Sequence, residues 1–214
     1  GFINCHLPFN APKKYWDLHD RNQLPLPAFE IPPEDAPSFA VKKGGEIDNF
    51  KPIDPFRALP YEEDLKRNLI HGYYASISYM DKQLGRIMRE VKNLGLDKNT
   101  IIMLWGDHGW HLGDHGIWTK HTNYEQSTRI PIIIKAPGVT EEGSVCNQMV
   151  ETVDLFPTLA DLANLERKLP NQEIDGKSLT PLLKDPSKPV KDHIYHAYIR
   201  QGYLGEAIRN KRYR

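Results

Sequence analysis

Two copies of the tripeptide Asp-His-Gly, seven residues apart, make the stretch WGDHGWHLGDHG (residues 105–116) the first place to look for chemistry. A carboxylate oxygen suits a hard divalent cation and an imidazole nitrogen binds several metals, so each Asp-His pair could supply two ligands of a metal site. An Asp-His pair in a loop can equally serve as a turn or capping device. The elements that precede each pair distinguish these uses.

The first pair follows a short apolar run, TIIMLW at residues 100–105, which predicts a buried strand; RIPIIIKAPG, from residue 129, predicts another. Both runs are nearly continuous in hydrophobicity, as expected for strands that helices cover on both faces. Ligands of open α/β sheets bind beyond the carboxyl ends of the strands, where Asp107 and His108 stand. Asp114 and His115 lie further along, in a loop rich in glycine. Asp107 and His108 are therefore the better candidates for metal ligands, with a turn or capping role still open, and they would need further ligands to complete a site.

Two other side chains could act on a bound anion. Lys120 follows the loop in GIWTKHT, and an ammonium beside a metal suits a tetrahedral oxyanion because it supplies charge and three donors. His6 lies in NCHLPF and could add a proton donor, although a histidine there also fits a structural role.

The elements that would position these residues begin with a long helix. Apolar residues recur in steps of three and four from Tyr61 to Leu94, which predicts one amphipathic helix. Glu62, Glu63 and Asp64 would complement its dipole, and Gly95 stands where a C-cap is expected.

Helices and strands alternate after this helix. VDLFPTLADLANL, Val153 to Leu165, predicts a second helix, and HIYHAYI and EAIRNKRYR predict two strands, the latter running on to Arg214. This order predicts an α/β fold. Residues 1–60, with LPLPAFEIPPEDAPSF at their centre, show little periodicity and predict an extended, loop-rich segment.

Composition limits the class of protein. The 214 residues, 39% hydrophobic, are enough for one sizeable core. Since 28 basic residues balance 28 acidic ones, charge indicates neither a nucleic-acid nor a membrane partner. Cys5 and Cys146 could form at most one disulfide. No run approaches the roughly 18 apolar residues of a membrane span.

Several spaced motifs resemble those of sulfatases, within the alkaline-phosphatase-like superfamily. IIMLWGDHGWHLGDHGIWTKHTNYEQSTRIPIIIKAPG is similar to their Asp-His-Gly, G-[DE]-H-G-x-W-x-K and T-R-[IVT]-P-[LI] series. GFINCHLPF and HGYYASISYMDKQLGRIM resemble segments of the iduronate-2-sulfatase group in particular, and VETVDLFPTLADLA and IDGKSLTPLL are typical of the family. The resemblance implies the family's sheet flanked by helices: residues 1–190 match the C-terminal part of the catalytic domain, and 191–214 the start of a smaller C-terminal subdomain.

The resemblance also implies roles for individual residues. Asp107 and His108 match two ligands of the family's divalent cation, usually calcium. Lys120 matches the lysine that contacts the sulfate group, and His6 the histidine that binds sulfate or serves the leaving group. Trp110 and His115 fall in the loop that lines the pocket and are candidates for substrate contact.

Two departures qualify the match. Asn4 and Cys5 stand where the iduronate-type motif has Lys-Pro. Sulfatases also use a formylglycine made from the Cys or Ser of a C/S-x-P/A-x-R motif, together with an aspartate pair near the N-terminus, and neither is found in this sequence. We therefore expect the chain to be the C-terminal part of a catalytic domain, inactive without the N-terminal half of the same enzyme.

Three alternatives for function stay open. The intact protein would hydrolyse a sulfate ester of a sugar, in a glycosaminoglycan or algal polysaccharide. A phosphodiesterase or phosphonate monoester hydrolase of the same superfamily would carry a similar metal loop, and a sulfatase-like domain without chemistry would bind only. The sparse cysteines and lysine-rich surface favour a bacterial periplasmic or secreted enzyme, with the lysosome as the alternative.

Overall fold

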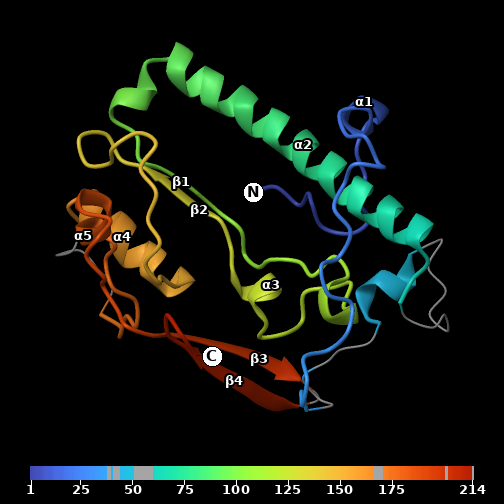
Figure 1. Ribbon diagram of the computed structural model, residues 1–214. Coiled ribbons are helices and arrows are strands. Elements are labelled where there is room, and N and C mark those ends of the chain that lie inside the picture. Colours follow the sequence, from blue (N-terminus) through green and yellow to red (C-terminus); the bar gives the residue numbers. More distant parts are fainter. Residues whose placement is uncertain (38–39, 41–43, 51–59, 166–170, 201, 214) are drawn as a thin grey trace. The chain divides into compact units, whose positions relative to one another are not determined.

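A computed structural model describes residues 1–37, 40, 44–50, 60–165, 171–200 and 202–213 (Figure 1). The chain divides into two compact units. The first contains residues 1–93 and 108–129, and the second contains residues 94–107 and 130–214. The elements combine helices with strands, and the predicted α/β class is confirmed by solved structures that share the fold.

The first unit is built on the long helix α2, Glu63–Asn93, which confirms the helix predicted from the apolar stripe. Its buried side chains include Leu65, Leu69 and Ile70. Gly95 follows in the left-handed conformation, with φ of 69°, as the predicted C-cap requires. The short helix α1, Lys13–Trp16, lies beside α2 (Figure 1).

Most of the described N-terminal segment is irregular, as predicted, apart from α1 and the 3-10 turn η2, Glu46–Asn49. The segment is nevertheless anchored to α2. Lys66 on α2 contacts Glu30 with its Nζ 2.6 Å from Oε1, and both side chains are largely buried. Ile47 is 1% exposed and joins the core of this unit. The other buried members of that core are Leu7, Phe9, Tyr61, Leu65, Leu69, Ile70, Trp110 and Trp118.

The remaining short elements of the first unit, η4 (Asp114–Gly116) and α3 (Glu125–Thr128), belong to the loop that carries the predicted site. In the second unit, η3 (Leu96–Lys98) precedes the first strand. Thr152–Asp154 (η5), α4 (Leu155–Leu162) and α5 (Thr180–Lys184) surround a small core. Its buried residues are Leu155, Leu179 and Leu182. The predicted helix from Val153 therefore forms, but ends at Leu162.

The two predicted strands of the second unit form as β1, Ile102–Trp105, and β2, Ile132–Lys135. They pair antiparallel, with Leu104 opposite Ile133. Within the described residues, Trp105 is 48% and Ile133 62% exposed. The side chains of β2 alternate between half-buried and exposed, as on a strand with one open side, whereas in β1 only the last residue, Trp105, is exposed.

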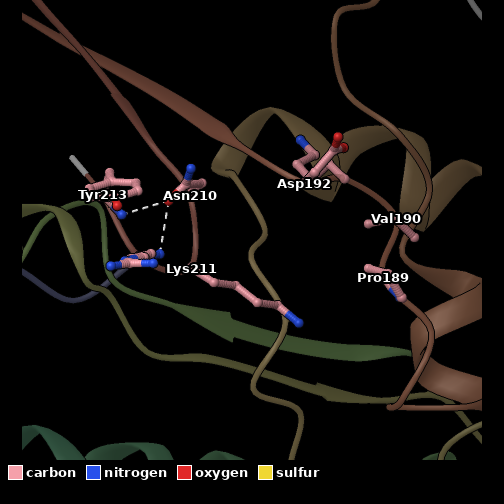
Figure 2. Close-up of a pocket in the computed structure, with 8 residues that line it drawn as sticks. Pro189, Val190, Asp192, Asn210, Lys211 and Tyr213 are labelled. Atoms are coloured by element: carbon pink, nitrogen blue, oxygen red, sulfur yellow. Dashed lines mark hydrogen bonds between the residues drawn. The ribbon is translucent and has the colours of Figure 1, made fainter.

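A second antiparallel pair, β3 (Ile194–Arg200) and β4 (Tyr203–Arg209), forms a hairpin. The prediction that the last strand continues to Arg214 was wrong, because β4 ends at Arg209. Asn210 Oδ1 accepts hydrogen bonds from the backbone N–H groups of Arg212 and Tyr213, 2.8 and 2.6 Å away, and this turn ends the strand. A hollow of about 600 Å³ lies between residues 189–192 and 210–213 (Figure 2).

Candidate functional site

Lys120 is at the centre of the candidate site. Its Nζ lies 2.7 Å from His6 Nε2, so the structure joins two of the predicted residues that are 114 positions apart. Only 10% of the Lys120 side chain is exposed, against 40% of His6. A nearly buried ammonium next to an imidazole is suited to holding an anion and moving a proton.

Trp110 forms the floor beneath this pair. Lys120 Nζ lies 4.7 Å from the centre of the Trp110 ring, and the His6 ring meets the same indole edge-on with centroids 5.9 Å apart. Trp110 Nε1 donates a hydrogen bond to the carbonyl of Trp118 at 3.0 Å, which fixes the orientation of the indole. The cation–π contact therefore places the ammonium over a ring that a hydrogen bond orients.

His6 is oriented by its own backbone neighbour. The peptide bonds Asn4–Cys5 and Leu7–Pro8, on either side of His6, are cis. His6 Nδ1 lies 2.9 Å from the Leu7 carbonyl, to which it donates. This contact assigns the Nδ1–H tautomer to the neutral ring, so that Nε2 accepts from the Lys120 ammonium. His6 therefore presents Nε2 to the site.

Glu46 is the member of the site that the sequence did not predict. Its Oε1 lies 2.6 Å from Lys120 Nζ and its Oε2 lies 3.4 Å from His6 Nε2. Burial raises the pKa of this carboxyl, but the adjacent Lys120, with smaller effects of His6 and His121, brings the pKa below its ordinary value. No motif surrounds Glu46 in KKGGEIDN, so only the fold could reveal it.

Asp107 and His108 follow β1, at the strand end where the sequence places them. His108 Nδ1 lies 2.9 Å from the Gly109 carbonyl, a contact that leaves Nε2 as the acceptor nitrogen of the neutral ring. A carboxylate and an oriented imidazole are donors that fit a divalent cation. Within the described residues no group of three or more His, Cys, Asp or Glu side chains converges to hold a metal, so this pair is an incomplete ligand set.

Gly109 is required by a close backbone approach after His108. Its N–H donates to the Ser127 carbonyl at 2.7 Å, and a Cβ at Gly109 would lie 2.1 Å from the Gln126 carbonyl oxygen. Any side chain would force these segments apart. The first Asp-His-Gly therefore ends in a glycine because α3 packs against it.

The second Asp-His-Gly has a different environment. Asp114 accepts hydrogen bonds from the backbone N–H of Ala28 at 3.2 Å and from Gln126 Nε2 at 3.1 Å. His115 has a left-handed backbone, with φ of 59°, and its ring lies 4.7 Å from those of both Phe29 and Tyr124. Asp114 thus stabilises the loop by joining it to the N-terminal segment and to α3. The substrate contact suggested for His115 stays a prediction, and its ring is packed between two aromatic side chains.

His111 lies between the two pairs and is 3% exposed. Its Nε2 is 2.8 Å from Thr122 Oγ1, and its Nδ1 is 3.1 Å from the Asp114 carbonyl. Burial lowers the pKa of His111 to about 4, so the ring is neutral at pH 7. It therefore contributes to the loop as an uncharged core residue.

This geometry can be compared with known proteins. Residues 1–165 match the family model for sulfatases. The chain belongs to the sulfatase family. Mouse (Mus musculus) iduronate 2-sulfatase is 32% identical to this sulfatase chain over 193 residues, which cover 77% of the chain and 35% of that protein. The chain thus spans about a third of the length of this relative.

Solved structures extend the comparison. One solved structure, described as in complex with its substrate D-glucosamine-2-N,6-O-disulfate, has a TM-score of 0.63 and 28% identity to this chain. The match covers 70% of this chain and 32% of the other. A phosphonate monoester hydrolase from Silicibacter pomeroyi has a TM-score of 0.70 and 27% identity, covering 92% and 39%. Both place the chain in the alkaline-phosphatase-like fold that the motifs implied.

The structure also bears on the two cysteines and on membrane-spanning helices. Cys5 and Cys146 are not joined by a disulfide in the described structure. In the part of the chain that the structure describes, no helix is long and apolar enough to cross a bilayer.

Proposed function

We propose that the protein to which this chain belongs hydrolyses a sulfate ester of a sugar. The observation that carries the proposal is the contact of Lys120 Nζ with His6 Nε2 over the face of Trp110. Membership of the sulfatase family supports the reaction class. The sugar disulfate named as the substrate of one solved neighbour supports a carbohydrate substrate, and the proposed classes are a glycosaminoglycan and an algal polysaccharide.

In this proposal Lys120 binds the sulfate oxygens, since its ammonium supplies a positive charge and donors without planar geometry. When the nucleophile bonds to sulfur, the bond from sulfur to the ester oxygen breaks and the departing alkoxide needs a proton. His6 would supply this proton from Nε2 in its imidazolium form and return to the neutral ring, whose Nε2 lies 2.7 Å from Lys120 Nζ. Trp110, and by the family resemblance His115, would contact the sugar.

Two groups complete the proposed site. Formylglycine supplies the nucleophilic oxygen in sulfatases, and its C/S-x-P/A-x-R motif does not occur in this sequence. Asp107 and His108 would hold a divalent cation, with calcium as the proposed ion, and the other ligands would come from outside the described residues. We propose that the formylglycine and the remaining metal ligands belong to an N-terminal half of the same protein. The 214-residue chain alone would then have no turnover.

Domain organisation and location follow from the same resemblance. Residues 1–190 would be the C-terminal part of the catalytic domain, and 191–214, which include the β3–β4 hairpin, would begin a smaller subdomain. We propose a bacterial periplasmic or secreted location, with the lysosome as the alternative.

The test compares the 214-residue chain with the protein extended through the open reading frame upstream of Gly1. Both are assayed with an aryl sulfate, a sulfated uronate or hexosamine, and an aryl phosphonate monoester. We expect the extended protein to hydrolyse the sulfate esters and the chain to have no turnover. Preference for the phosphonate would support the second candidate, which the likeness to the Silicibacter pomeroyi hydrolase favours. Turnover by the chain alone, or an upstream sequence without the nucleophile motif, would overturn the proposal.

A further inference from the structure

Glu46 is a carboxylate inside a site that should receive an anion. Its Oε1 is 2.6 Å from Lys120 Nζ, closer to that nitrogen than His6 Nε2 at 2.7 Å. An incoming sulfate group needs the same ammonium. The carboxylate and the sulfate oxygens therefore compete for one cation.

The position of Glu46 is set by the fold. Glu46 begins η2, and the next residue, Ile47, is 1% exposed in the core of the first unit. The backbone N–H of Gly45 donates to Asp48 Oδ2 at 2.7 Å, which closes the turn from the other side. The carboxylate is thus held on a short anchored turn while its side chain remains 25% exposed. It can leave Lys120 without disturbing the core.

The charges of the cluster cancel before any ligand binds. Lys120 contributes one positive charge and Glu46 one negative charge, and the two charged groups lie 2.6 Å apart. Two charges at this separation, both partly desolvated, interact more strongly than in water. A site in this state attracts an anion only weakly until the carboxylate withdraws.

We propose that Glu46 is an internal counter-ion of Lys120 that the sulfate group of the substrate must displace, so that Glu46 sets the affinity of the site for anions. The inference rests on the proposed function, because it takes Lys120 as the sulfate contact. Glu46 is a positioning residue in this scheme: it holds the ammonium over Trp110 in the empty site and releases it on binding. It also disfavours small free anions, which lack the sugar contacts that help a substrate to displace the carboxylate.

The chain offers a matched control in the Lys66–Glu30 pair. Its Nζ–Oε1 distance is also 2.6 Å, and its side chains are 11% and 29% exposed, against 10% and 25% for Lys120 and Glu46. Glu30 holds the N-terminal segment on α2 and has no assigned role in anion binding. Glu30→Gln therefore removes a pair of the same geometry and burial with only a structural effect.

The experiment titrates inorganic sulfate into the 214-residue chain at constant ionic strength, following the Trp110 indole N–H signal by NMR. We expect Glu46→Gln to bind sulfate about three- to tenfold more tightly than the wild type, as the removal of one partly exposed ion-pair competitor predicts. Glu46→Asp keeps the charge and should stay near the wild-type affinity, and Glu30→Gln should do the same. Lys120→Met should abolish binding.

The outcomes separate this inference from the proposed function. Equal or weaker sulfate binding by Glu46→Gln overturns the counter-ion role, while loss of binding in Lys120→Met would still support the sulfate contact. If neither the wild type nor Glu46→Gln binds sulfate, or if Lys120→Met binds as well as the wild type, both the inference and the sulfate role of Lys120 are wrong. Circular dichroism of each variant excludes unfolding as the cause of lost binding.

Discussion

Lys120 Nζ and His6 Nε2 are 2.7 Å apart although 114 residues separate them in the chain. The contact joins the N-terminal segment to the loop after β1, and Trp110 lies beneath it. An ammonium and an imidazole this close can divide anion binding and proton transfer between them.

Replacing Lys120 with Met should lower kcat/KM of the extended protein for a sulfate ester by about 100-fold or more, because one preorganised donor to developing charge is removed. Lys92→Met, at an exposed position near the end of α2, is the control and should leave kcat/KM unchanged. Steady-state kinetics with an aryl sulfate measure both. A loss of less than threefold in Lys120→Met would argue against the sulfate contact.

The two Asp-His-Gly copies should respond differently to the same substitution. Asp107→Ala should weaken binding of calcium to the extended protein on the order of tenfold or more, since a charged ligand is lost. Asp114→Ala should leave calcium affinity unchanged and lower the free energy of unfolding by about 1 kcal/mol, because Ala28 N–H and the Gln126 amide lose their acceptor. Calorimetric titration and urea unfolding measure the two effects. Equal calcium affinity in Asp107→Ala and the wild type would remove this pair from the metal site.

Acid should destabilise the loop through His111. The unfolded chain binds a proton at this ring near its ordinary pKa of 6.5, whereas burial lowers the pKa in the folded chain to about 4. The free energy of unfolding should therefore fall as the pH drops through this window, by about 2 kcal/mol between pH 7 and pH 5. Urea unfolding at the two pH values tests this. His111→Asn should show a smaller decrease, and an equal decrease would assign the effect to other groups.

Two glycines should give stability changes of opposite sign when replaced with Ala. Gly109→Ala should lower the free energy of unfolding by at least about 2 kcal/mol, because the new Cβ would lie 2.1 Å from the Gln126 carbonyl oxygen. Gly85→Ala, inside α2 with its nearest neighbour 3.7 Å away, should raise it by about 0.5–1 kcal/mol. Thermal unfolding compares them. A neutral Gly109→Ala would mean that the approach of α3 is not required.

Sequence predicted what depends on neighbours along the chain. The steps of three and four gave α2 to within two residues at its start, and Gly95 marked its end, because both signals are local. The last strand was predicted to extend too far. Its end depends on the side chain of Asn210, which accepts hydrogen bonds from the backbone N–H groups of Arg212 and Tyr213. The 62% exposure of Ile133 could not be predicted either, since it depends on what packs on the sheet and not on the strand itself.

The site was predicted only in part for the same reason. Residue type and position, and then the family resemblance, pointed to Lys120 and His6, and the structure places their side chains 2.7 Å apart. Glu46 gave no signal, because a glutamate after two glycines has no periodicity or spacing that indicates a partner. Its contact with Lys120 exists only once the N-terminal segment has folded back onto the loop.

The hydrogen bonds of residues 28–30 have a practical consequence for any attempt to shorten the chain. Ala28 N–H bonds to the Asp114 carboxylate, the Phe29 carbonyl accepts the His115 N–H at 2.8 Å, and Glu30 neutralises Lys66. Removing the proline-rich segment would remove these hydrogen bonds to the loop. It would also leave the largely buried Lys66 ammonium on α2 without Glu30. The minimal folding unit for studying this site therefore begins upstream of that segment, although its composition looks dispensable.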